Sequence, residues 1–291
     1  MTKGSSTLDY FRITVPYYIP IAIIGIFLGI ATSGGIFNYN VLLSFVSVAA
    51  LVAAFNTFNG VTDLKIDLIN KPHRPIPSGK ITRKTASLYS VILYIICLII
   101  AYSLTVQFFQ ITILAVIITI LYSFPPVRLR KRFIISNLCG ATIYGLLCPL
   151  LGWSLTPLNP LPIYILIFTF LFALSLSMSK DFEDYIGDKA FRIGTIPVVL
   201  GIEKAKLIST IMLSLSFAYL VSVAVLGFIE IRYLLIIITL PGFIALIRRM
   251  YQDHKRFYNS IEERRIAKRI FLILMGLAIL VEFLIGIVAL F

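Results

Sequence analysis

The chain has 291 residues, of which 59% are hydrophobic and only 13% are charged, and its mean hydropathy is +0.97. Soluble domains hold about 45–50% apolar and about 25% charged residues, so this composition excludes a soluble globular protein and predicts an integral membrane protein. The net charge of +13 does not indicate nucleic-acid binding, because no recognisable nucleic-acid module accompanies it and basic loops are common beside anionic lipid.

Nine continuously apolar runs follow a short polar start over residues 1–9, which lacks the features of a cleavable signal peptide. A helix needs about 17–25 residues to cross a bilayer, and a membrane barrel would show short alternating segments instead. We therefore predict an all-α membrane protein, a single domain over residues 1–291 with nine transmembrane helices in a bundle around a central apolar cavity. The runs are centred on residues 15–32, 41–58, 86–105, 108–124, 137–154, 161–178, 206–227, 232–247 and 270–290.

Basic residues lie almost entirely in alternate loops. With nine helices, 25 of the 26 Lys and Arg residues fall on one side of the membrane, and only Arg232 falls on the other. The positive-inside rule places the basic side in the cytoplasm. We therefore expect a multi-pass protein of the cell membrane with a cytoplasmic N-terminus and with Phe291 outside.

The second apolar run ends at a first acidic cluster, in a chain with only 13 Asp and Glu residues. Asn59, Asp63 and Asp67 follow one another at intervals of four, so they share one face if the helix continues through them. Carboxylates are costly near hydrocarbon and usually have a ligand or partner there. This set, called the first stripe below, is a candidate metal site.

Two basic loops follow the first stripe on the same predicted side. Residues 70–80 contain three prolines and a glycine, which predict a stiff loop, and Lys71 and Arg74 lie in it. The segment 122–132 follows the fourth run and holds Arg128 and three further basic residues at 130–132, which are ordinary loop charges by the positive-inside rule alone. Cations in these loops can offset the charge of a departing diphosphate.

The sixth apolar run ends at a second acidic cluster, Asp181, Asp184 and Asp188, called the second stripe. Lys180, Asp184 and Asp188 repeat the spacing of the first stripe. Carboxylate oxygens suit Mg²⁺, which binds through one or two carboxylates plus substrate phosphates. The two stripes, with active-site loops at about 59–84 and 180–205, therefore predict a site for Mg²⁺ and a phosphorylated ligand. The alternative is a set of solvated salt bridges with neighbouring lysines, namely Lys65, Lys71, Lys180 and Lys189.

The remaining polar features of the apolar runs are few. Cys97, Cys139 and Cys148 lack metal-site spacing and are expected to be small buried residues. Glu282 lies in the last run and is expected to form a hydrogen bond between helices. A cation transporter stays open as an alternative, although transporters place polar residues at the membrane midplane and these stripes lie at helix ends.

These motifs together resemble the UbiA superfamily of intramembrane prenyltransferases over about residues 10–290. The first stripe with residues 70–79 is similar to the first signature of that family, and residues 180–188 with 195–197 are similar to the second. Tyr122, Ser123 and Arg128, with the two prolines between them, are similar to the loop that separates the signatures. Residues 60–62 depart from many members, which carry an acidic or aromatic residue there.

The resemblance implies a Mg²⁺-dependent enzyme that binds an isoprenyl diphosphate and a lipid-soluble acceptor within the membrane. Its implied metal ligands are Asn59, Asp63, Asp67, Asp181, Asp184 and Asp188, with the choice between Asp181 and Asp184 left open. Its implied substrate-binding residues are Lys71, Arg74, Arg128, Lys180 and Ser123. The implied catalytic residues are Asp63, Asp67, Asp184, Asp188 and Tyr122, whose ring could stabilise an allylic cation.

The acceptor is not determined by these motifs. They are most similar to members that transfer a geranylgeranyl group to the glycerol hydroxyl of geranylgeranylglyceryl phosphate, in archaeal ether-lipid synthesis. An aromatic acceptor from quinone synthesis is the alternative. Chain length and oligomeric state stay open.

Overall fold

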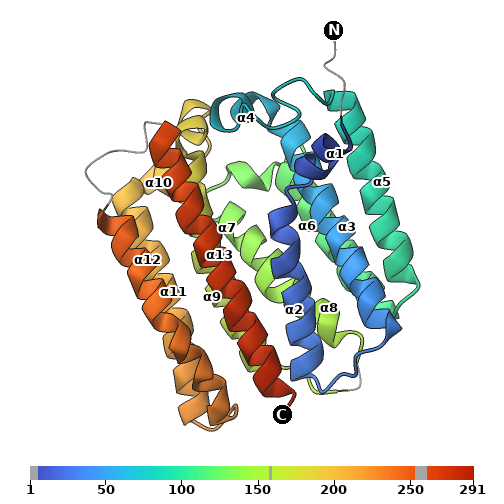
Figure 1. Ribbon diagram of the computed structural model, residues 1–291, viewed down its shortest axis with the longest axis vertical. Helices are drawn as coiled ribbons and strands as arrows, with labels where there is room; N and C mark the ends of the chain where they lie inside the picture. The colour runs from blue at the N-terminus through green and yellow to red at the C-terminus, as the bar shows by residue number, and fades with distance from the viewer. Residues whose placement is uncertain (1–5, 157–158, 253–260) are drawn as a thin grey trace.

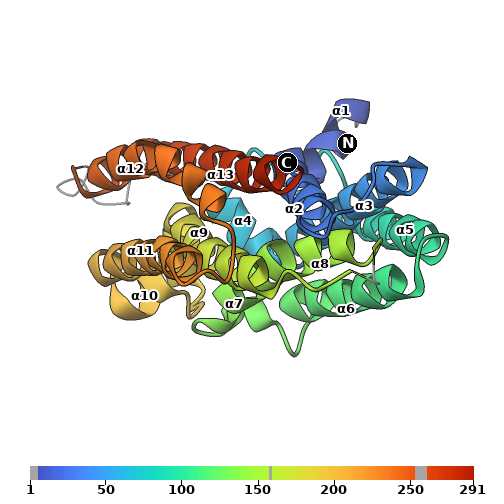
Figure 2. The same cartoon turned by 90° about the horizontal axis from the view of Figure 1, so that it is seen from below.

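Helices make up all of the regular structure in the residues that the computed structural model describes, which are 6–156, 159–252 and 261–291. The long helices stand side by side (Figures 1 and 2), and α13 lies against both α2 and α9. The α-helices are α1 (Thr7–Ile13), α2 (Ile19–Thr32), α3 (Tyr39–Thr62), α4 (Leu64–Asn70), α5 (Arg83–Tyr102), α6 (Val106–Ser123), α7 (Ile135–Ala141), α8 (Cys148–Trp153), α9 (Ile163–Ala190), α10 (Ile196–Leu200), α11 (Ile202–Val225), α12 (Leu240–Gln252) and α13 (Ile261–Ala289). Shorter or irregular turns are η1 (Pro16–Tyr18), η2 (Leu129–Lys131), η3 (Thr142–Leu147) and η4 (Ile231–Thr239).

Eight helical segments of the described chain are long and apolar enough to cross a membrane. A further pair, Thr7–Ile13 with Pro16–Thr32, passes the same test together but bends by 49°, and counting it as one span gives nine. The structure therefore confirms an all-helical, multi-pass membrane protein. The count of nine and the direction of the N-terminus stay predictions.

Several predicted helices differ in detail from the apolar runs. The run at 137–154 forms the consecutive helical segments α7, η3 and α8, and η3 has π-helical geometry. The run at 232–247 begins as the 3₁₀ helix η4. Helices α9 and α13 extend well beyond their apolar runs at the end that carries the charged residues. These extensions matter because they support polar side chains beyond the hydrocarbon.

Close helix contacts in the bundle depend on small residues. A Cβ atom on Gly29 of α2 would collide with the carbonyl of Pro149 in α8, and one on Gly152 would collide with the carbonyl of Ile26. Membrane helices associate without a strong hydrophobic driving force, so such close approach supplies the packing energy. These glycines thereby allow α2 and α8 to pack closely against each other.

Both acidic stripes lie at the same end of the bundle. Helix α4 covers this end in Figure 1, at the same end of the bundle as the N-terminal end of α13. Helix α4 also contacts α9, so segments that are more than a hundred residues apart in sequence meet here. This end of the molecule holds the candidate site.

Candidate active site

The first stripe crosses a junction between two helices. Helix α3 ends at Thr62. Asp63 is the C-cap residue of α3 and the N-cap residue of α4. Backbone hydrogen bonds nevertheless continue at intervals of four, from Asp63 N to Asn59 O (2.9 Å), from Asp67 N to Asp63 O (2.9 Å) and from Lys71 N to Asp67 O (2.7 Å). The three side chains therefore remain on a common face, as predicted. Asn59 Nδ2 also donates to Asp63 Oδ2 at 2.9 Å.

The second stripe lies on the single unbroken helix α9. Asp184 and Asp188 are buried, and Asp181 accepts a hydrogen bond from Asn137 Nδ2 of α7 at 2.9 Å. Asp181 lines the cavity described below. The hydrogen bond from Asn137 to Asp181 therefore distinguishes the environment of Asp181 from those of Asp184 and Asp188.

Cations from the two basic loops pair with the stripes. Lys71 Nζ lies 2.5 Å from Asp184 Oδ1, which joins the loop after the first stripe to the second stripe. Burial alone would lower the pKa of the Lys71 ammonium, but the Asp184 and Glu183 carboxylates outweigh it and raise that pKa above its ordinary value. Lys71 therefore stays charged at neutral pH.

The first stripe has its own cationic partners. Arg74 NH1 lies 3.1 Å from Asp67 Oδ2, and Arg128 NH2 lies 2.6 Å from Asp63 Oδ1. The carboxylates are almost completely buried, with exposed fractions of 1% for Asp63 and 3% for Asp67. The alternative of solvated loop salt bridges therefore does not describe these pairs. Buried charges of this kind persist only with partners.

Arg130 joins the two stripes, and the sequence analysis did not select it. Its guanidinium pairs with Asp63 of the first stripe, and it lies 3.4 Å from Asp188 and 4.0 Å from Asp184 of the second. Arg128 has a φ of 41°, in the left-handed region, and the 3₁₀ turn η2 follows it. This turn aims Arg130 inward, while Arg132 stays exposed.

Asn70 holds the two signature regions together. Its Nδ2 donates to the carbonyl of Asp184 at 2.9 Å, and its Oδ1 accepts from the backbone N–H of Gly187 at 2.8 Å. A Cβ atom at Gly187 would lie 2.5 Å from the Asn70 amide, so this close approach requires glycine. Sequence reasoning placed Asn70 in the first signature but did not predict this contact.

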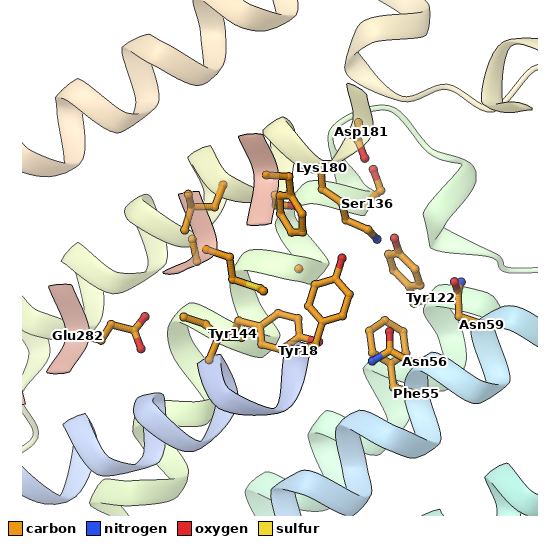
Figure 3. A pocket seen from close by; sticks show the side chains of 17 residues that line it. Tyr18, Phe55, Asn56, Asn59, Tyr122, Ser136, Tyr144, Lys180, Asp181 and Glu282 are labelled. Carbon is orange, nitrogen blue, oxygen red and sulfur yellow. The ribbon is translucent and has the colours of Figure 1, made fainter. Parts of the chain in front are cut away.

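An apolar cavity of about 890 Å³, including the part open to its surroundings, lies beside the stripes. Figure 3 shows Lys180 and Asp181 at one end of it, Tyr18, Tyr122 and Asn59 along its wall, and Glu282 at the far end. The Tyr122 ring packs edge-on against Phe55 with centroids 5.3 Å apart. Aromatic faces thus line the space next to the acidic residues.

The other predicted residues occupy different places. Lys180 lines the cavity, and its ammonium lies 6.0 Å from the Tyr18 ring centroid. Ser123 is fully buried and accepts a hydrogen bond from Asn59 Nδ2 at 3.2 Å, so it contacts the first stripe and does not line the cavity. Glu282 is buried, but its Oε2 has no hydrogen-bond partner among the described residues, so the expected bond is not found for that atom. The three cysteines are buried, as expected.

The donor chemistry of the stripes fits Mg²⁺. The carboxylates of both stripes supply hard oxygen donors, and Arg130 lies within 4.0 Å of Asp63, Asp184 and Asp188. Within the described residues, no three His, Cys, Asp or Glu side chains gather closely enough to hold a metal ion by themselves. Mg²⁺ is often bound by only one or two carboxylates together with substrate phosphates.

The fold and the site together define a multi-pass membrane protein whose apolar cavity ends at two facing acidic stripes and their buried cations. Residues 18–260 match the model of the UbiA prenyltransferase family. The chain belongs to this family, which makes it a prenyltransferase and sets the transporter alternative aside.

Curated relatives agree with this assignment. The digeranylgeranylglyceryl phosphate synthase of Methanosphaera stadtmanae is 32% identical over 203 residues, which cover 70% of this chain and 73% of the relative. The enzyme of the same name from Pyrococcus horikoshii is 34% identical over 170 residues, covering 58% of this chain and 60% of the relative.

Solved structures share the fold. A UbiA homolog from Archaeoglobus fulgidus bound to GPP and Mg²⁺ has a TM-score of 0.71 at 22% identity, covering 95% of this chain and 99% of that one. A structure from work on digeranylgeranylglyceryl phosphate synthase has a TM-score of 0.62 at 24% identity, covering 95% and 98%. At these identities the comparison concerns the fold alone.

Proposed function

We propose that this protein transfers a geranylgeranyl group from its diphosphate to the glycerol hydroxyl of geranylgeranylglyceryl phosphate, with Mg²⁺ as cofactor. The observation that carries the chemistry is the pair of facing acidic stripes, joined by Arg130 and Lys71, at the mouth of an aromatic-lined apolar cavity. The relatives named digeranylgeranylglyceryl phosphate synthase support the choice of acceptor.

Each part of the site has a role in this reaction. The cavity would hold the isoprenyl tail, and the diphosphate would lie between the stripes. Asn59, Asp63, Asp67, Asp184 and Asp188 would hold Mg²⁺, which would supply Lewis-acid assistance to the leaving group. Lys71, Arg74 and Arg128 offset the charge that develops on the diphosphate as the allylic C–O bond breaks and its electron pair leaves with the oxygen.

The aromatic wall and the apolar surroundings protect the allylic cation. Tyr18 and Tyr122 line the cavity beside the stripes, and their ring faces can stabilise positive charge at the first carbon of the chain. Closure of the site against water prevents loss of the cation as an alcohol. The acceptor hydroxyl oxygen then forms the new C–O bond with the first carbon of the chain, and its proton passes to the departed diphosphate. The basic side of the bundle would face the cytoplasm by the positive-inside rule.

The test is turnover of the purified full-length protein with labelled geranylgeranyl diphosphate, Mg²⁺ and two acceptors. We expect an ether product with geranylgeranylglyceryl phosphate and none with 4-hydroxybenzoate, an aromatic acid. Prenylation of the aromatic acid alone would instead establish the quinone-type alternative. Omission of Mg²⁺ with a chelator should stop diphosphate release.

A further inference from the structure

A second pocket lies outside the diphosphate site, between the loop that follows α4 and the first turns of α13. Its volume is about 970 Å³, including the part open to solvent, and its walls include Asn70, His73, Glu183, Arg265 and Lys268. Figure 1 shows α4 and this end of α13 at the same end of the bundle. None of the site residues predicted from the sequence lines this pocket.

The pocket gathers positive charge that the acidic stripes do not use. Lys268 Nζ lies 4.0 Å from Glu183 Oε1 and 5.8 Å from the Tyr17 ring centroid, and Arg265 is exposed on the same helix three residues earlier. The pKa of His73 is lowered by partial burial and then by the charges of Lys268 and Arg74. Lys268 and Arg265 therefore place two cations on one concave surface, which favours an anion.

The pocket and the cavity are one helical turn apart on two different helices. On α13, Lys268 lines the pocket and Phe271 lines the cavity; on α9, Glu183 lines the pocket and Lys180 lines the cavity. Three residues of helix correspond to about 5 Å. A ligand that carries a phosphate and a hydroxyl on a short chain can therefore bind the pocket with the first group and place the second group at the mouth of the cavity.

We propose that this pocket binds the phosphate monoester of the acceptor lipid, with Lys268 and Arg265 as its cationic partners. The inference rests on the proposed function and adds the recognition of the acceptor head group. Lys268 stands near the start of the apolar part of α13, so the phosphate lies at the level of the membrane surface and the lipid tail extends into hydrocarbon.

The kinetic test uses the double variant Lys268→Gln with Arg265→Gln in nanodiscs of neutral lipid. We expect the KM for geranylgeranylglyceryl phosphate to rise about tenfold or more, because a charge-assisted contact to phosphate is lost, while the KM for geranylgeranyl diphosphate is unchanged. The KM for the same acceptor without its phosphate should not change either. Arg83→Gln, at an exposed basic residue on the same side, is the matched control.

A binding test separates this inference from the proposed function. The chain has two histidines, so a His254→Asn background leaves His73 as the single native histidine signal in an isotope-labelled sample. Addition of glycerol 1-phosphate should shift that signal in the native pocket and not in the double variant, whether or not the acceptor is prenylated.

Three results would overturn the phosphate pocket. The first is an unchanged KM for the phosphorylated acceptor in the double variant, and the second is an equal rise for both acceptors, which indicates a structural effect. The third is a His73 shift caused by phosphatidic acid in the disc but not by glycerol 1-phosphate or the acceptor, which assigns the pocket to bilayer lipid. Absence of any ether product with native protein contradicts the proposed function and leaves the binding test intact.

Discussion

The two acidic stripes have similar spacing in the sequence but different construction in three dimensions. The second stripe lies on the unbroken helix α9, whereas the first stripe crosses from α3 into the short helix α4. Helix α4 has only seven residues, and its end lies against α9. Asn70 and Lys71 contact the second stripe there. The segment that carries the first stripe therefore supplies carboxylates and also the side chains that contact the second stripe. The second stripe is held on one continuous helix.

The largest expected effect tests whether the two stripes are equivalent in catalysis. Asp63→Ala and Asp184→Ala should each reduce turnover by about a thousandfold or more, because each removes a charged oxygen ligand from the diphosphate site. The measurement is diphosphate release from geranylgeranyl diphosphate at saturating Mg²⁺. Glu230→Ala, at an exposed acidic residue outside the site, should keep native activity. Retained activity in one of the two aspartate variants would falsify the two-stripe site.

The next effect tests the bridge between the stripes. Arg130→Gln leaves three buried carboxylates without a shared cation, and we expect a loss of about 3 kcal/mol in the free energy of unfolding in the absence of divalent ions. Mg²⁺ should stabilise this variant more than the native protein, because the ion replaces the lost positive charge. Unfolding is followed by denaturant titration in detergent with and without Mg²⁺.

Arg132→Gln is the matched control for the bridge, since Arg132 lies in the same loop but is exposed. It should leave stability and its response to Mg²⁺ unchanged. Equal losses in both variants would show that the loop, and not the Arg130 ion pairs, determines the effect.

The difference between the stripes also explains how far the sequence could predict the site. The apolar runs and the four-residue spacing predicted an all-helical membrane protein and the position of the second stripe at the end of a long helix, because these follow from local periodicity and composition. The roles of the stripe residues and the loop cations stay predictions. The break at Asp63 was not predicted, since no proline or glycine stands at that position. The continued backbone hydrogen bonds nevertheless preserved the predicted face.

The missed residues are those whose role depends on contacts between distant segments. Arg130 stands in a run of basic residues that the positive-inside rule already explains, and only the left-handed Arg128 turns it inward. Asn70 and Asn137 are single amides at helix ends, whose partners on α9 are 114 and 44 residues away. Neither spacing nor composition marks such residues.

A smaller effect tests whether α4 positions the second stripe. Asn70→Ala removes two hydrogen bonds to the α9 backbone and leaves a buried carbonyl and N–H without these partners, at an expected cost of about 1–3 kcal/mol in unfolding free energy. Turnover should fall as well, because Lys71 follows Asn70 directly. Stability by denaturant titration and turnover by product formation are measured together.

Gly187→Ala approaches the same contact from the α9 side, because its Cβ would collide with the Asn70 amide. The double variant Asn70→Ala with Gly187→Ala removes that collision, so it should be less impaired than the sum of the single variants. Strict additivity would contradict a direct contact between these residues.

The smallest effect concerns the aromatic wall that both stripes share. Tyr122→Phe keeps the ring face and should retain most of the turnover. Tyr122→Leu keeps the apolar volume but removes the π face. We expect about a tenfold lower kcat for the leucine variant, because a desolvated cation–π contact contributes about 1–2 kcal/mol. The measurement is single-turnover formation of the ether product at saturating substrates. If leucine and phenylalanine variants react equally fast, Tyr122 only fills space against Phe55, and the charge of the cation is stabilised by the stripes and their diphosphate alone.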